Sequence, residues 1–202
     1  MSDRSPIEEF SDREDAIDFL ATNALSGLRF ASAERQHLAQ GIVDLFAVDE
    51  LLGPPGDRRL MNKSKKWVVR SKDLQLIDAI GGILQGSAAG GALIASTGSL
   101  PLTLLAPAIA VLTYLAKIAF NVRDKGVSLE PVELNILCRL KEAKSGLDVQ
   151  QLIKELNTLS PEQTLQSVNA HLDKLQNCHT RSGENISLVW KSSNERWFTN
   201  DV

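Results

Sequence analysis

The stretch Ala79–Ser96 reads AIGGILQGSAAGGALIAS, and after a short turn the stretch Leu102–Phe120 reads LTLLAPAIAVLTYLAKIAF. The first arm, and the second arm before Lys117, contain no charged side chain. Each arm has about 18–20 residues, roughly the length of a helix that crosses the hydrocarbon core of a bilayer. We therefore predict a mainly α protein with an apolar, glycine-rich helical hairpin over residues 74–122, its two arms being transmembrane helices.

Three glycines of the first arm recur at every fourth residue. On a helix, Gly82, Gly86 and Gly90 would share one face and form a groove that a second backbone can approach closely. This glycine zipper is typical of membrane helices that pack on a neighbour, and it predicts self-association through the hairpin. Helices that are apolar all round also occur in protein cores. A hairpin buried inside a domain or an oligomer is therefore the alternative interpretation.

Basic residues flank the hairpin on both sides. They are Arg58, Arg59, Lys63, Lys65, Lys66, Arg70 and Lys72 before it, and Lys117, Arg123 and Lys125 after it. Basic residues next to an apolar helix favour the cytoplasmic side of a membrane and attract anionic lipid. We expect a membrane protein with both termini in the cytoplasm and with lipid as a partner. The alternative is a cytoplasmic protein whose basic run is a solvated loop or contacts phosphate groups.

Residues 1–60 are acidic and predict helices. Ser11 and Glu14 fit a capping box at the start of a first helix. Apolar spacing predicts a second helix from about Ala33 to Val48. The run Gly53–Asp57 interrupts this pattern as a loop.

Residues 61–73 are interpreted as a basic linker between this acidic region and the hairpin. The acidic residues of the first helix are Asp12, Glu14, Asp15 and Asp18. They have no histidine or cysteine near them, so we interpret them as a solvated face and not as a metal site.

Residues 128–202 predict a separate C-terminal domain. Pro131 starts a helix with apolar residues at core spacing, and Asp148 is the predicted N-cap of a short helix over Val149–Leu156. A longer helix is predicted over Pro161–Gln176. Alternation then indicates a strand over Ile186–Trp190, followed by a short strand over Arg196–Thr199.

The order of these elements resembles the winged helix-turn-helix superfamily. The residues that carry the resemblance are LDVQQLIKELNTLSPEQTLQSVNAHLDKLQ (147–176) and RSGENISLVWKSSNERWF (181–198). The superfamily includes DNA readers and protein-interaction modules, so the resemblance implies a fold with a small β-wing and a macromolecular partner. It places the partner or nucleic-acid face on Gln163, Gln166, Asn169, Lys174 and Arg181.

The charge of this domain favours a protein partner over DNA. Residues 127–202 hold eight basic and ten acidic side chains, a net charge of −2. Binding of duplex DNA depends on neutralising its phosphates, and the helix over Pro161–Gln176 has no arginine. DNA binding is the alternative.

The sequence gives little support for catalysis. Cys138 and Cys178 form no CxxC pair, which indicates reduced thiols in the core. Cys178 and His179 are neighbours at the start of a predicted strand, where successive side chains point to opposite faces. They are therefore a poor nucleophile–base pair. We predict no enzymatic activity, no cofactor and no metal.

Three functions fit these observations. The first is a non-enzymatic, membrane-associated effector, in which the winged-helix module receives a protein partner and the glycine-zipper hairpin packs, oligomerises or permeabilises a membrane. The second is a membrane-tethered winged-helix DNA-binding regulator. The third is a soluble oligomeric assembly subunit that buries the apolar hairpin.

Overall fold

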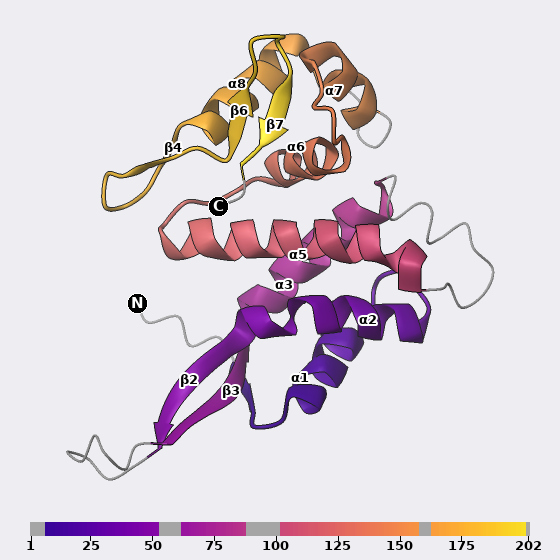
Figure 1. Ribbon diagram of the computed structural model, residues 1–202, viewed down its shortest axis with the longest axis vertical. Coiled ribbons are helices and arrows are strands. Elements are labelled where there is room, and N and C mark those ends of the chain that lie inside the picture. Colours follow the sequence, from indigo (N-terminus) through magenta and orange to yellow (C-terminus); the bar gives the residue numbers. More distant parts are fainter. Residues whose placement is uncertain (1–6, 53–61, 88–101, 158–162, 201–202) are drawn as a thin grey trace.

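The computed structural model describes residues 7–52, 62–87, 102–157 and 163–200. In Figure 1 the described elements form three layers: a sheet with helices from the N-terminal region, two crossing helices in the middle, and the C-terminal helices with short strands.

The N-terminal layer is an antiparallel sheet covered by helices. Its elements are β1 (Ile7–Phe10), α1 (Arg13–Phe19), η1 (Leu20–Ala24), α2 (Ser32–Ile42), η2 (Val43–Phe46), β2 (Ala47–Leu52) and β3 (Asn62–Arg70). The strand order is β1-β3-β2. Trp67 and Val69 are two residues apart on β3 and therefore lie on the same face of the strand. Both are buried, as expected for a strand with one face on a core. Asp12 caps α1 by accepting a hydrogen bond from the Glu14 amide at 2.8 Å.

The secondary structure here differs from our expectation in two places. The residues that we interpreted as a basic linker form β3 and the first turn of α3 (Ser71–Gln85). The second predicted helix ends near Phe46, because Ala47 begins β2 and pairs with Trp67.

The middle layer consists of α3 and α5 (Leu102–Asp124). Asp73 joins them: one carboxylate oxygen accepts from the Arg70 amide at 2.9 Å and the other accepts from the Arg123 guanidinium of α5 at 2.7 Å. Helix α5 packs on α2, α3 and α6 (Pro131–Glu142). Leu112 and Leu115 of α5 are fully buried, each stabilising the fold by about 1.5–3 kcal/mol relative to exposure.

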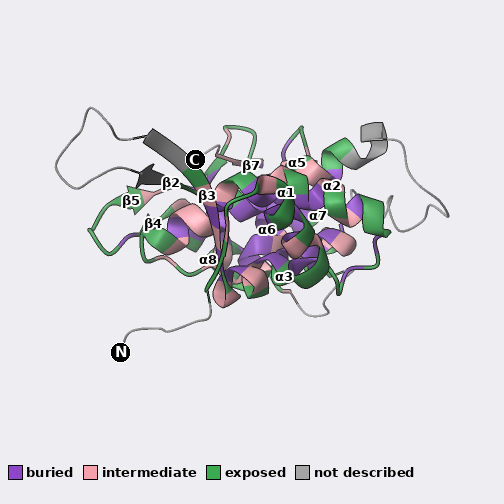
Figure 2. Cartoon of the chain, turned by 90° about the horizontal axis from the view of Figure 1, so that it is seen from below, coloured by how far each residue is buried: buried purple, intermediate pink, exposed green. Residues whose placement is uncertain are grey.

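The prediction of transmembrane helices is wrong for the part of the chain that the structure describes. No helix there is long and apolar enough to cross a membrane. The prediction failed because a helix can be apolar on several sides for another reason. Helix α5 is covered by protein from both outer layers, so its apolar residues face other helices. Figure 2 shows the buried residues gathered in the middle of the molecule, with exposed residues around them.

The glycine ladder does not form one helical face over the described residues. Gly82 faces open space, Gly86 is the C-cap of α3, and Gly90 lies outside the described residues. The α3 glycine that packs closely against another segment is Gly81, where an added Cβ would lie 2.7 Å from Leu28 Cδ1.

The C-terminal layer contains α6, α7 (Val149–Leu156) and α8 (Leu165–Gln176), with strands β4 (Cys178–His179), β5 (Asn185–Ile186), β6 (Val189–Lys191) and β7 (Trp197–Thr199). Asp148 caps α7 as predicted, accepting from the Gln151 amide at 2.8 Å. Strand β7 pairs with β6 on one side and with Leu147 on the other. The winged-helix resemblance stays a prediction. The helix expected from Pro161 begins at Leu165, with Thr164 as its N-cap, and the single strand expected over Ile186–Trp190 is divided between β5 and β6.

Candidate interaction surface

The two faces of the β6–β7 hairpin differ in character. Val189 and Trp197 are buried, whereas Trp190 and Phe198 are directly opposite each other in the register and point to the other face. Their rings stack with centroids 4.7 Å apart and planes 16° apart. Trp190 remains 43% exposed. A large aromatic surface is therefore open on the face that the core does not use.

Gly146 allows Phe198 to lie against the backbone. It has φ of +69°, and a Cβ at this position would lie 2.5 Å from Phe198 Cζ. The adjacent Leu147 exchanges two backbone hydrogen bonds with Trp197, of 3.2 and 2.8 Å. The loop after α6 thus holds strand β7 through Leu147 and the Phe198 ring through Gly146.

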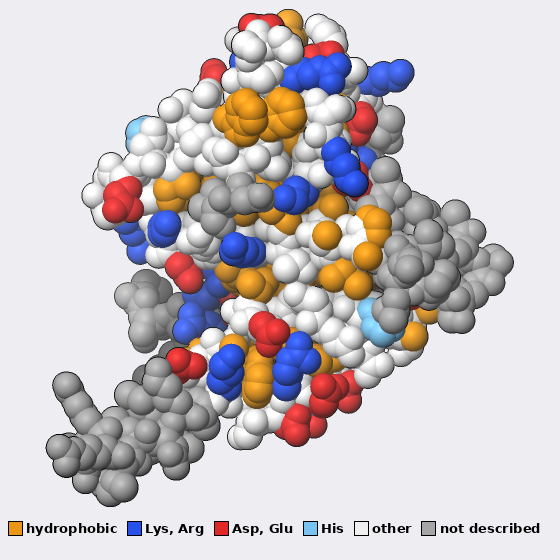
Figure 3. Space-filling view, viewed as in Figure 1, with side chains coloured by type: hydrophobic (Ala, Val, Ile, Leu, Met, Phe, Trp, Pro, Cys, Tyr) orange, Lys and Arg blue, Asp and Glu red, His pale blue; other side chains and the backbone are white. Residues whose placement is uncertain are grey.

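A groove of about 580 Å³ lies next to this aromatic pair. Its lining comes from α5, the C-terminal end of α6 with the residues that follow, and β7: Pro107, Ala110, Val111, Leu140, Lys141, Glu142, Ala143, Lys144, Phe198 and Thr199. Figure 3 shows hydrophobic side chains over β6 and β7 and along α5, with Lys and Arg side chains between them. We call this groove, together with Trp190, the aromatic groove.

The predicted partner face of α8 is only partly free. Gln166 and Asn169 are exposed, but Gln163 binds Ser167 through its side chain at 2.9 Å. Lys174 turns to α6, and Arg181 lies against Gly126 after α5. Besides the paired Lys174, the exposed α8 residues are Leu165, Gln166, Asn169, Ala170 and Asp173, which carry one charge.

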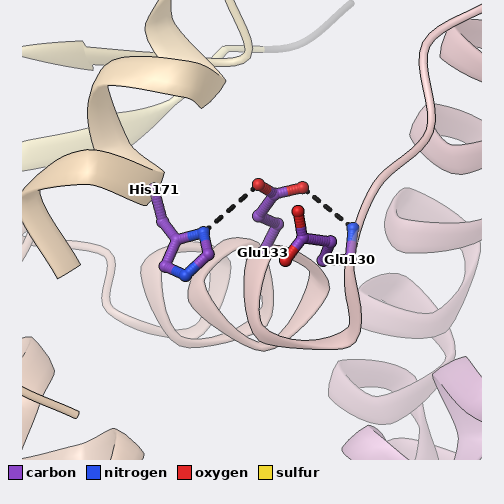
Figure 4. A group of neighbouring side chains, drawn as sticks. All are labelled: Glu130, Glu133 and His171. Atoms are coloured by element: carbon purple, nitrogen blue, oxygen red, sulfur yellow. Dashed lines mark hydrogen bonds and ion pairs between the residues drawn. The ribbon is translucent and has the colours of Figure 1, made fainter. Parts of the chain in front are cut away.

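Lys174 belongs to a charged cluster between α6 and α8. Its ammonium nitrogen lies 2.8 Å from Glu130 Oε1 and 2.7 Å from Glu133 Oε1. His171 Nδ1 lies 3.3 Å from the same Glu133 oxygen, and the other Glu133 oxygen accepts from the Glu130 amide at 2.8 Å (Figure 4). The Glu133 side chain is fully buried.

This cluster has the donor atoms of a metal site but already holds a cation. One ligand atom from each of Glu130, Glu133 and His171 lies within 4.8 Å of the others. The hydrogen bonds to Glu130 and then Glu133 raise the pKa of Lys174, and the hydrogen bond from Lys174 lowers the pKa of Glu130. A metal would have to displace the ammonium, so we assign the cluster a structural role.

Two of the basic residues predicted to flank a membrane span form ion pairs within the protein. Lys66 pairs with Glu9 at 2.9 Å, and Arg123 pairs with the buried Asp73. Lys65, Arg70 and Lys125 are exposed, Lys72 is half-buried, and Lys63 pairs through its backbone in β3. Arg58 and Arg59 lie outside the described residues.

The thiols are poorly suited to nucleophilic chemistry. Burial, the largest cause, raises the pKa of Cys138 to about 12, and burial also raises the pKa of Cys178. Because the thiolate is the reactive form, neither side chain is activated near neutral pH.

Comparison with known proteins assigns no family. No family model, curated protein or solved structure matches this chain. The function is therefore inferred from the side chains on the surface of the molecule. Sequence reasoning missed the aromatic groove, although the alternation around Trp190 and the Gly146 turn were visible signals of it.

Proposed function

We propose that the protein is a non-enzymatic interaction protein, one subunit of an assembly, whose C-terminal layer binds a protein partner at the aromatic groove. The exposed Trp190, stacked on Phe198 beside an apolar groove, is the observation that carries this proposal. Tryptophan is enriched among the residues that dominate binding energy at protein interfaces. Contiguous exposed apolar surface is also uncommon outside such sites.

The charges of α8 support a protein partner over duplex DNA. Two cations of the predicted DNA face, Lys174 and Arg181, lie against α6 and Gly126. The exposed Lys174 of α8 is paired with Glu130 and Glu133, and the exposed Asp173 beside it is negative. Nonspecific and specific DNA binding both depend on cations that replace counterions along the phosphates, and α8 presents no cation that lacks a carboxylate partner.

The test is site-specific photo-crosslinking in cells with the full chain. A photoreactive phenylalanine analogue replaces Trp190 in one experiment and the exposed Leu165 of α8 in the matched control. We expect a partner protein to crosslink at position 190 and not at position 165. Crosslinking at position 165 alone would move the site to α8.

Purified partner then gives the affinity. Trp190→Ser and Ala110→Gln should each weaken binding by about 10- to 30-fold, as for residues that dominate an interface. Leu165→Ser should leave the affinity within about twofold. Sequence-selective, nanomolar binding of duplex DNA by the full chain would contradict the proposal.

A further inference from the structure

We propose that the aromatic groove selects an acidic amphipathic helix of its partner; this inference rests on the proposed function above. Three features of the groove carry it: the apolar walls, the cations at one end, and the short free strand edge on β7.

The apolar walls fit side chains that repeat at helical spacing. Pro107, Ala110 and Val111 come from one turn of α5, and Leu140 and Phe198 face them from α6 and β7. A partner helix that presents apolar residues at i, i+3 or i+4, and i+7 places them in one row. Such a row can enter a groove formed between a helix and a small sheet.

The strand beside the groove offers little edge to an added strand. Strand β7 has three residues; it pairs with β6 on one side, and Trp197 pairs with Leu147 on the other. Strand addition requires unpaired backbone groups along an edge, and β6 offers an edge of three residues. Recognition must therefore come from side chains, which favours a helix over an extended segment.

The end of the groove near the α6 C-terminus is cationic. Lys144 lines it and is exposed, whereas the ammonium of Lys141, which also lines the groove, lies 4.3 Å from the centre of the Tyr114 ring. The Arg196 guanidinium donates to the carbonyl of Ser145, the residue after Lys144, at 3.1 Å.

The acidic residue of the groove lining lies next to a buried arginine. The Glu142 carboxylate is 3.7 Å from the Arg139 guanidinium. The α6 C-terminus contributes only about half a negative elementary charge. The exposed Lys144 and the nearby Arg196 guanidinium therefore favour acidic side chains on the partner.

Two synthetic helical peptides test the selectivity against the full chain. Both span about four helical turns with leucine at one face; one carries glutamate at the other positions and the other carries lysine. We expect the acidic peptide to bind more tightly at low salt, with the preference reduced by added salt because exposed charges are screened.

Charge reversal provides the decisive variant. Lys144→Glu should weaken binding of the acidic peptide by about three- to tenfold and strengthen binding of the basic one. The matched control is Lys154→Glu, the same change on an exposed lysine of α7 outside the groove lining, which should change neither affinity. Equal affinity for the two peptides, or equal effects of the two variants, would overturn the inference.

The failure of the proposed function would show separately. Trp190→Ser should weaken both peptides, because the aromatic surface is common to them. If Trp190→Ser and Ala110→Gln leave peptide binding and partner crosslinking unchanged, the groove is not the binding site. If these variants weaken binding but the wild type binds the acidic and basic peptides equally, the groove is the binding site and it does not select acidic partners.

Discussion

Glu133 is a buried carboxylate with a cationic side chain beside it. Its carboxylate is fully buried, and the Lys174 ammonium at 2.7 Å balances it from a side chain that is 43% exposed. Removing one partner of such a pair leaves an uncompensated buried charge. Replacing both partners by neutral groups avoids that cost.

We predict that Lys174→Met lowers the free energy of unfolding by about 1–3 kcal/mol, because Glu133 then loses its main cation. Glu133→Gln combined with Lys174→Met should recover part of the loss. Urea denaturation measures both, and Lys154→Met on the α7 surface is the control. Equal stability of Lys174→Met and wild type would show that His171 or water neutralises Glu133 instead.

We predict that the buried Cys138 thiol makes the protein less stable at high pH. Burial raises the pKa of its thiol from 9.0 in the unfolded chain to about 12, so the folded state holds this proton more tightly. Below pH 9 the thiol is protonated in both states, and its contribution to the free energy of unfolding is complete. As the pH rises toward 12 only the unfolded chain loses the proton, so the free energy of unfolding falls by up to about 1.4 kcal/mol per pH unit. Chemical denaturation between pH 8 and about 10.5 should therefore show a steeper decline for wild type than for Cys138→Ala. Parallel pH profiles would contradict the prediction.

At the scale of elements, two adjacent glycines of α3 have opposite surroundings. Gly81 faces Leu28 at contact distance, and Gly82 faces open space. Gly81→Ala should destabilise the fold by about 1–3 kcal/mol through overpacking against Leu28. Gly82→Ala should stabilise it by about 0.5–1 kcal/mol, since alanine favours a helix interior. Thermal unfolding of the two variants gives the comparison, and a stability loss in Gly82→Ala would restore the glycine ladder as a packing face.

The loop after α6 allows a second matched pair. Gly146 and Gly183 both have positive φ, of +69° and +84°, but Phe198 lies against Gly146 alone while Gly183 has open space. Alanine at either position carries the backbone cost of about 1–2 kcal/mol. Gly146→Ala should lose more, and it should also weaken binding at the aromatic groove by moving Phe198. Denaturation and peptide binding measure the two effects, and equal results for the pair would remove the role of Gly146 in positioning the ring.

At the scale of the whole molecule, the middle helices couple the outer layers. Helix α6 packs on both α3 and α5, and its Arg139 guanidinium donates to the Gly86 carbonyl at the end of α3 at 2.7 Å. Separating the C-terminal layer would expose this face to water, at about 25 cal/mol per Å² of apolar surface. The sequence favoured an independent domain over residues 128–202, whereas this packing favours a single cooperative unit.

We predict that β3 and α8 unfold in one transition. Native-state hydrogen exchange in increasing denaturant should give the slowest amides of both elements the same opening free energy. A lower opening free energy for α8, with β3 still protected, would show that the C-terminal layer opens by itself and would support the separate domain.

What the sequence determined by itself was the local structure of the C-terminal layer. Pro131 at the start of α6, Asp148 as the N-cap of α7 and the apolar periodicity of α8 act within a few residues of the element that they define. Such signals can be read without knowing the rest of the fold. The same reasoning predicted the N-terminal helices, although Asp12 replaced Ser11 as the first cap.

The tertiary structure alone decided the sheet, the environment of the hairpin and the aromatic groove. Strand β1 pairs with β3, far along the chain, and no local signal identifies such a partner. An apolar helix such as α5 suits lipid or protein equally by composition, and only the helices packed around it distinguish the two. The groove joins α5, α6 and β7, because binding surfaces form where the fold brings distant residues together.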